Sequence, residues 1–184
     1  YIGKRTQVNG AKIREGASIG AVCRIAGEIS HSIILDYSNK NHEGYLGNAY
    51  IGDWVNFGAM STNSNLKNNY GSIRVIEEGA PVDTGLIKMG LICGDNARFG
   101  IGSLITTGAV VGTGANVFGA GGVVGRFTPS FAWGASTPGA ATHAYKIDSF
   151  LRDAERAMAR RSVPVDKAYA EIIRHIFAET AAER

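Results

Sequence analysis

The sequence predicts an all-β repeat fold, a parallel β-helix built from hexapeptide repeats, followed by a C-terminal α-helical hairpin. Two observations lead to this fold class: aliphatic residues recur at intervals of six, and the C-terminal segment changes to a helical period. Six is a multiple of the two-residue period of a strand but not of the 3.6-residue period of an α-helix. The 25 glycines in 184 residues suit a chain that turns many tight corners.

The hexapeptide repeat is longest in the second half of the predicted β-helix. Its aliphatic or aromatic positions are Ile87, Cys93, Phe99, Ile105, Val111, Val117 and Val123. Small residues recur at a second phase, namely Gly90, Gly102, Gly108, Gly114 and Ala120, with Asn96 in the remaining slot. Shorter runs are Ile13, Ile19 and Ile25, and then Ile51 and Phe57. Three short strands joined by corners make one triangular coil, and stacked coils bury the column of sixth-position side chains.

The repeat divides the chain into three parts. We expect the β-helix over 1–127, interrupted by an irregular, asparagine-rich insertion at about 61–86. A connector rich in Pro, Gly, Ser and Thr follows at 128–145, and helices occupy 146–184. Pro164 separates two amphipathic helices, and Asp166 is a suitable N-cap for the second. The expected apolar faces are Phe150, Leu151, Ala154 and Met158 in the first helix and Tyr169, Ile172, Ile173 and Ile176 in the second.

Composition excludes several classes of function. The net charge is only +3 and no Lys/Arg cluster is interleaved with aromatic residues, so no nucleic-acid partner is expected. Cys23 and Cys93 match no zinc or redox spacing, and the histidines at 31, 42, 143 and 175 supply no hexad-spaced metal ligands. No metal site is therefore predicted. The apolar stretch 105–124 contains too many glycines for a membrane-spanning helix, so no membrane partner is expected.

The sequence also leads to expectations about the cellular location of the protein and about whether the chain is a fragment. No signal peptide opens the chain and the cysteines fit a reduced compartment, so a cytoplasmic location is expected. The first residues, Tyr1-Ile2-Gly3, already belong to the repeat, so we expect a fragment of a longer protein. The glycine-rich run at 119–125 lies within the repeat and lacks the strand-turn-helix context of a dinucleotide-binding loop.

One motif resembles a known family. The stretch K-N-H-E-G-Y-L-G-N-A-Y-I-G-D-W-V-N-F-G-A, followed by T-N-S-N-L-K-N-N-Y-G, is similar to the acetyltransferase half of bacterial N-acetylglucosamine-1-phosphate uridyltransferases. It also resembles sugar-1-phosphate nucleotidyltransferase-like proteins with a β-helical C-terminal domain. The resemblance extends over about residues 13–125. It implies a left-handed β-helix, a handedness that the spacing itself does not reveal.

The resemblance implies a reaction and a set of site residues. His42 would be the general base that takes a proton from the amine of a glucosamine-1-phosphate-like substrate while the amine attacks acetyl-CoA. This role is chemically sound, because a protonated amine is not nucleophilic and a neutral imidazole can accept the proton. Tyr45 and Asn56 match sugar-phosphate-binding positions, and Asn65 matches a substrate-contacting asparagine. A lone histidine is more often structural, and that reading stays open on the residues alone.

The chain also departs from the family pattern. The family places a lysine and an arginine on the sugar phosphate, where this chain has Ala26 and Val8. About four extra residues precede His42 when the hexads are aligned. Lys40 and Lys67 could replace the missing cations, or they could be solvated loop charges. The serine that the family offers to acetyl-CoA is replaced by Ile101, so no residue is assigned to cofactor binding.

Two hypotheses of function follow. The first is a CoA-dependent N-acetyltransferase domain acting on an amino-sugar phosphate. The second is a non-catalytic β-helix that trimerises or regulates a sugar-1-phosphate nucleotidyltransferase. Under both we expect a homotrimer, because apolar residues occupy two adjacent phases of the repeat and one phase must point outward. The residues concerned are Val110, Val111, Val117, Phe118, Val123 and Val124. The resemblance places the acyl-transfer sites between subunits, with His42 facing the second hexad run of the next chain.

Overall fold

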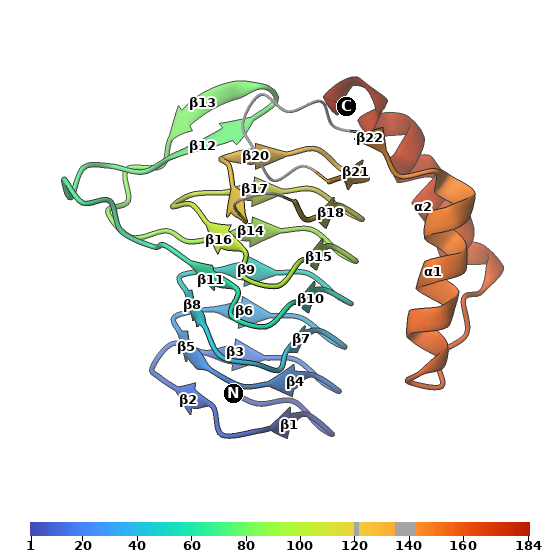
Figure 1. Ribbon diagram of the computed structural model, residues 1–184, viewed down its shortest axis with the longest axis horizontal. Coiled ribbons are helices and arrows are strands. Elements are labelled where there is room, and N and C mark those ends of the chain that lie inside the picture. The colour runs from blue at the N-terminus through green and yellow to red at the C-terminus, as the bar shows by residue number, and fades with distance from the viewer. Residues whose placement is uncertain (120–121, 135–142) are drawn as a thin grey trace.

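The computed structural model describes residues 1–119, 122–134 and 143–184. It is a parallel β-solenoid with three sides, against which a helical hairpin packs along one side (Figure 1). This architecture confirms the expected fold class, a β-helix followed by C-terminal helices. Part of the expected connector, 135–142, and the corner position Ala120 lie outside the described residues.

Each side of the solenoid is a ladder of two- or three-residue strands. The side that faces the helices is an eight-stranded sheet made of β1 (Gln7–Val8), β4 (Arg24–Ile25), β7 (Asn39–Lys40), β10 (Asn56–Phe57), β15 (Arg98–Phe99), β18 (Asn116–Val117), β21 (Ala132–Trp133) and β22 (His143–Ala144). The second side is a six-stranded sheet made of β3 (Ser18–Ile19), β6 (Ile33–Ile34), β9 (Tyr50–Ile51), β14 (Ile92–Cys93), β17 (Val110–Val111) and β20 (Phe127–Thr128).

The third side is split into two three-stranded sheets. The first contains β2 (Lys12–Ile13), β5 (Glu28–Ser30) and β8 (Tyr45–Gly47), and the second contains β11 (Thr62–Asn63), β16 (Leu104–Ile105) and β19 (Val123–Val124). Asn63 joins the two sheets, because its amide accepts from the Gly47 N–H at 2.8 Å and donates to the Gly47 carbonyl at 2.9 Å. Between β11 and β14 the chain leaves the coil and forms the antiparallel hairpin of β12 (Arg74–Glu77) and β13 (Ala80–Asp83).

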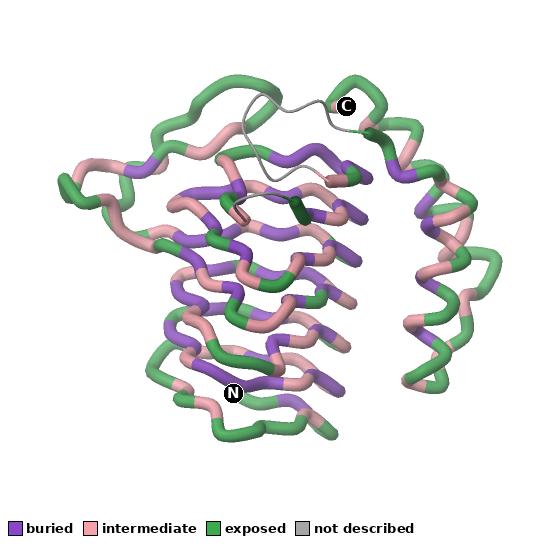
Figure 2. Tube along the Cα trace, viewed as in Figure 1, coloured by how far each residue is buried: buried purple, intermediate pink, exposed green. Residues whose placement is uncertain are grey.

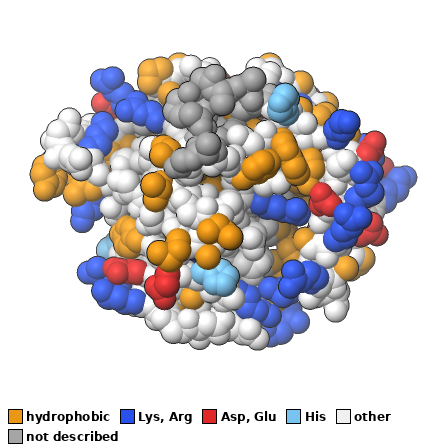
Figure 3. All heavy atoms as spheres, in the orientation of Figure 1, with side chains coloured by type: hydrophobic (Ala, Val, Ile, Leu, Met, Phe, Trp, Pro, Cys, Tyr) orange, Lys and Arg blue, Asp and Glu red, His pale blue; other side chains and the backbone are white. Residues whose placement is uncertain are grey.

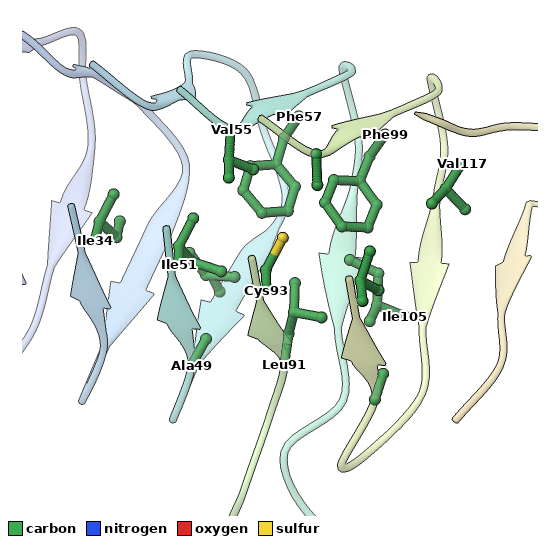
Figure 4. Packing of buried hydrophobic residues seen from close by; sticks show 14 of the residues in the cluster. Ile34, Ala49, Ile51, Val55, Phe57, Leu91, Cys93, Phe99, Ile105 and Val117 are labelled. Atoms are coloured by element: carbon green, nitrogen blue, oxygen red, sulfur yellow. The ribbon is translucent and has the colours of Figure 1, made fainter. Parts of the chain in front are cut away.

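The core is the stacked column of inward side chains that the six-residue period predicts. Figure 2 shows that buried residues recur along successive coils of the solenoid. Phe57 and Phe99, from consecutive rungs, stack with ring centroids 4.7 Å apart, and Cys93 lies in the same column (Figure 4). Both cysteines are buried and free. Burying such a column supplies most of the stabilising free energy of a repeat fold.

Two ends of the long hexad run differ from the expectation. Ile87 is exposed because it precedes the first strand after the hairpin, and the inward column resumes at Leu91 and Cys93. Val123 points outward and Val124 is buried in its place, because the inward position falls seven and not six residues after Val117. A single extra residue exchanges the inward and outward faces of a strand.

The hairpin comprises α1 (Ile147–Ala159) and α2 (Lys167–Glu179), and α2 is followed by a short 3₁₀ turn, Thr180–Glu183. Asp166 caps α2, as expected, by accepting from the Tyr169 N–H at 2.8 Å. Phe150 and Ala154 pack with Ile173 and Phe131, whereas Ile172 is 58% exposed and does not belong to the expected apolar face. Within the described part of the chain, no helix has both the length and the apolar character needed to cross a membrane.

Candidate functional site

A cleft of about 930 Å³ lies between α1 and the eight-stranded sheet. Its floor is the outward ladder of that sheet, on which Arg24, Asn39, Asn56 and Arg98 occupy consecutive rungs. Its other wall is α1 and the turn that follows, including Arg160 and Arg161. The volume lies in the range of small-molecule sites in proteins, about 300–1,000 Å³.

His42 lines this cleft from the turn that joins β7 to β8, and its side chain is exposed. The turn is tightly built. Gly44 has a φ of 124°, and a Cβ at this position would collide with the backbone carbonyl of Ser61. Asn41 accepts a hydrogen bond from the Asn9 amide at 2.7 Å. The imidazole is therefore presented to solvent on a turn whose backbone has little freedom.

Lys40 lies beneath this turn, in the core and not in the cleft. It occupies the inward position of β7, is 2% exposed, and donates from Nζ to the carbonyls of His42 at 2.5 Å and Glu43 at 3.1 Å. This placement corrects the expectation that Lys40 contacts a substrate phosphate, because its ammonium is already bonded inside the coil. Its physical role is to hold the backbone of the His42 turn.

The buried ammonium makes stability depend on pH. Burial lowers the pKa of Lys40 from its ordinary value of 10.5, although the nearby Glu43 carboxylate opposes the shift. Between the folded and unfolded pKa values the unfolded chain binds more protons, so stability rises with pH in that window. Below the folded pKa the full burial cost remains.

We expect the free energy of unfolding of the parent, relative to a Lys40→Met variant, to increase as the pH rises through the lowered pKa toward the ordinary lysine value of 10.5. Urea unfolding of both proteins across this range measures the difference. A difference that does not change with pH would contradict the lowered pKa.

Tyr45 and Asn65 come together on the third side of the solenoid. The Asn65 amide donates to the Tyr45 hydroxyl at 3.0 Å and to the Asn48 side-chain oxygen at 2.7 Å. The Tyr45 ring lies directly over Gly47, where a Cβ would overlap it, which explains the glycine of the Y-L-G motif. His42 lies in the turn before β8, whereas the Tyr45 hydroxyl and Asn65 lie toward the corner after β8 and do not line the cleft.

Asn56 lies in the cleft with His42, as expected for two residues of one site. Its side-chain oxygen accepts a 3.4 Å hydrogen bond from the Asn39 amide, and the Asn39 oxygen accepts from Arg161 at 3.1 Å. The two asparagines therefore connect the centre of the cleft to the arginine end. Arg24, Asn39 and Arg98 were not among the site residues expected from the sequence.

Lys67 lies apart from these groups. It lines a smaller cleft of about 590 Å³ beside the β12–β13 hairpin, together with Arg126 and Thr106, and its ammonium donates to the Ser72 carbonyl. Within one chain it does not reach the cleft of His42. Its expected contact with substrate stays a prediction.

The helical hairpin is tied to the sheet at the upper end of the cleft. The Tyr145 hydroxyl donates to the Asp153 carboxylate, whose other oxygen accepts from Arg156 at 2.9 Å. These bonds lower the pKa of Asp153, while burial and the Asp153 contact raise the pKa of Tyr145 to about 12. Arg98 donates to the Asp153 backbone carbonyl at 3.3 Å. Among the described residues that line the cleft, Asp153 carries the one carboxylate, and it is thus already engaged.

At the positions where the chain departs from the family pattern, its side chains are apolar. Ala26 is buried, and Val8 lies in the first coil. Ile101 is 81% exposed at the rim of the cleft, so an apolar surface stands where a hydroxyl was expected. Across the residues that the structure describes, no three His, Cys, Asp or Glu side chains are grouped closely enough to hold a metal ion.

The fold and the cleft together define a hexapeptide-repeat β-helix protein with a histidine beside amide and guanidinium groups. No family model matches the chain. It is 32% identical over 99 residues to a bifunctional sugar-1-phosphate nucleotidylyltransferase/acetyltransferase of Sulfurisphaera tokodaii, a match that covers 54% of this chain and 24% of the relative.

Two further relatives are bifunctional GlmU proteins. That of a Synechococcus strain is 33% identical over 99 residues, covering 52% of this chain and 22% of the relative. That of Methanococcus maripaludis is 35% identical over 86 residues, covering 47% and 21%. The matches thus span about a quarter or less of these curated relatives. They confirm the resemblance that the H-E-G-Y-L-G motif predicts.

Proposed function

We propose that this chain carries an N-acetyltransferase site that moves the acetyl group of acetyl-CoA to the amine of an amino-sugar phosphate such as glucosamine 1-phosphate. The observation that carries the proposal is the His42 turn, which presents an imidazole to a cleft lined with hydrogen-bonding and cationic groups. The name of the Sulfurisphaera tokodaii relative, which combines nucleotidyl transfer to sugar 1-phosphates with acetyl transfer, supports the same chemistry.

His42 acts as the general base. It accepts a proton from the attacking amine, the amine nitrogen forms a bond to the thioester carbonyl carbon, and the tetrahedral intermediate then breaks its C–S bond. The proton held by the imidazole passes to the departing thiolate, which leaves as CoA thiol. A backbone N–H at a coil corner would donate to the oxyanion.

The neighbouring residues position the sugar. Asn56 offers an amide from the floor of the cleft, and Tyr45 and Asn65 offer a hydroxyl and an amide that already hydrogen-bond each other. Lys67 would approach from a neighbouring subunit. Lys40 contributes by holding the carbonyls of the His42 turn.

Product identification tests the proposal. The chain is incubated with acetyl-CoA and glucosamine 1-phosphate, and mass spectrometry identifies the sugar product. An N-acetylated sugar phosphate is expected, with CoA thiol in equal amount. N-acetylglucosamine 1-phosphate is the matched control, because it lacks a free amine and should release no thiol. Equal thiol release with both sugars would mean thioester hydrolysis and would refute amine acetylation.

The second candidate function, a β-helix that only trimerises or regulates a nucleotidyltransferase, is favoured by one observation. The six-stranded sheet presents a row of apolar side chains outward on five adjacent rungs: Ile33, Tyr50, Ile92, Val110 and Phe127. Ile33 is 47% and Tyr50 45% exposed. Such a row is typical of a surface that another molecule covers.

We propose that this row is the interface of a homotrimer, an assembly compatible with either function. The outward residues of the expected patch lie on different sides, since Val110 belongs to the six-stranded sheet and Val123 to the third side. Leu104 and Val123 are exposed on that third side. A cyclic trimer joins two different surfaces of neighbouring subunits, so the row of one chain would pack on the third side of the next.

Replacing Ile33 and Tyr50 together with lysine is expected to dissociate the trimer, because two charges would be buried in an apolar interface. Light scattering at micromolar concentration should give three chain masses for the parent and one for the variant. Ile172→Lys, which introduces the same charge on an exposed apolar position of α2, should stay trimeric. A monomeric parent would contradict the assembly and the shared site.

A further inference from the structure

The cleft under α1 has a strong excess of positive charge. Arg24 and Arg98 extend from its floor, and Arg156, Arg160 and Arg161 extend from its helical wall. The one carboxylate in the lining, that of Asp153, already pairs with Arg156 at 2.9 Å. In the described residues no other cleft arginine takes part in an ion pair.

Two of these charges, those of Arg24 and Arg161, meet at Asn39. Arg24 and Asn39 are register partners on adjacent rungs of the sheet, and Arg161 donates to the Asn39 side-chain oxygen at 3.1 Å. Burial lowers the pKa of Arg161, and the positive charges of Arg24 and Arg160 lower it further. The guanidinium groups are thus close enough to repel one another, and neither Arg24 nor Arg161 pairs with a carboxylate of the described residues.

Both arginines are held in place. Arg24 donates to the carbonyls of Val22 at 3.2 Å and Cys23 at 2.9 Å. Arg161 is fixed by Asn39 and by the turn after α1, where its own N–H donates to the Met158 carbonyl at 2.9 Å. Positioned guanidinium groups bind phosphate in a bidentate manner and lose little entropy on binding.

We infer that Arg24 and Arg161, with Asn39 beside them, bind the phosphate monoester of a substrate in this cleft. The inference rests on the proposed function in one respect only, the choice of substrates. It answers the question of which cations replace those missing at Ala26 and Val8, since Lys40 is bonded in the core and Lys67 lies in another cleft.

Two phosphate monoesters are available in the proposed reaction, that of the amino sugar and the 3′-phosphate of CoA. The Tyr37 and Trp54 rings, stacked with centroids 4.3 Å apart, line the same cleft. A flat aromatic surface next to arginines accommodates a nucleotide base, and the amides accommodate a sugar. The shared chemistry is the phosphate dianion, and the two sources are distinguished by experiment.

Isothermal titration tests the inference with glucosamine 1-phosphate, CoA and 3′-dephospho-CoA as probes. The variants are Arg24→Gln and Arg161→Gln, and Arg152→Gln on the exposed side of α1 is the control with the same charge change. We expect each cleft variant to weaken binding of one phosphate probe about tenfold or more, and the control to bind as the parent does. The effect should diminish at high salt.

The outcomes separate the two sources. If binding of glucosamine 1-phosphate weakens and the preference for CoA over 3′-dephospho-CoA is unchanged, the site holds the sugar phosphate. If that preference disappears, the site holds the 3′-phosphate. Unchanged affinity for every probe, or a parent that binds none of them, would overturn the inference. Circular dichroism spectra and melting temperatures equal to those of the parent would show that the variants are folded.

Isothermal titration of His42→Ala distinguishes the proposed phosphate site from the proposed acetyltransferase function. This variant should bind the phosphate probe as the parent does, whether or not the parent transfers acetyl groups. A parent that binds the phosphate probe but does not transfer acetyl groups would refute the proposed function and leave the phosphate site intact. Turnover unaffected by Arg24→Gln and Arg161→Gln would refute the phosphate site alone.

Discussion

Replacing His42 with alanine should lower kcat/KM for acetyl transfer by about 10²- to 10⁴-fold, the usual contribution of a general base. The exposed imidazole sits on a turn that Lys40 and Gly44 hold from inside the coil, so removing it should leave the fold unchanged. Initial rates of thiol release, measured with acetyl-CoA and glucosamine 1-phosphate, give the loss.

His175→Ala is the matched control for this prediction. His175 is exposed on α2 and does not line the cleft, so its loss should leave kcat/KM unchanged. Equal rates for His42→Ala and the parent would remove His42 from the mechanism. A loss in both variants would point to a general effect of histidine removal and not to a base in the cleft.

Lys40→Met should lower activity without lowering stability. Methionine fits the apolar inward column between Ile25 and Phe57, and replacing a buried ion with an apolar residue of similar volume is neutral or stabilising by about 1–4 kcal/mol. The carbonyls of His42 and Glu43 lose their donor, however, so the turn is no longer fixed. A displacement of about 1 Å in a catalytic group can reduce the rate about 10²-fold.

The expected result is therefore an unchanged or higher melting temperature together with a lower kcat. Lys12→Met, the same substitution at an exposed lysine paired with Glu28, should alter neither quantity. A variant that keeps full activity would show that Lys40 does not position the turn. A loss of stability above about 3 kcal/mol would show that the ammonium–carbonyl bonds hold the coil itself.

The fold could be predicted because one physical rule, the six-residue period of inward side chains, governs most of the chain. The same six-residue period also predicts the burial of two polar residues that were expected elsewhere or not considered. Ile34, Lys40 and Leu46 are spaced by six, as are Phe57 and Asn63, so the period places Lys40 and Asn63 inside the coil. Lys40 was expected either to bind a substrate phosphate or to be a solvated loop charge, although the spacing indicates burial.

The site was only partly predictable. His42 and Asn56 were expected together and do line one cleft. Arg24 and Asn39 each precede an inward residue, so their outward direction could have been deduced from the repeat. Arg161 could not, because it reaches the Asn39 rung only through the path of the helical hairpin, and residues 122 positions apart share no local pattern.

The most direct test of the account is the initial rate of thiol release by the parent chain, measured as a function of glucosamine 1-phosphate at fixed acetyl-CoA. The account predicts a rate that depends on the amine, saturates with the sugar phosphate and yields one N-acetylated sugar per thiol. A rate equal to that of the amine-free blank at every concentration would contradict it.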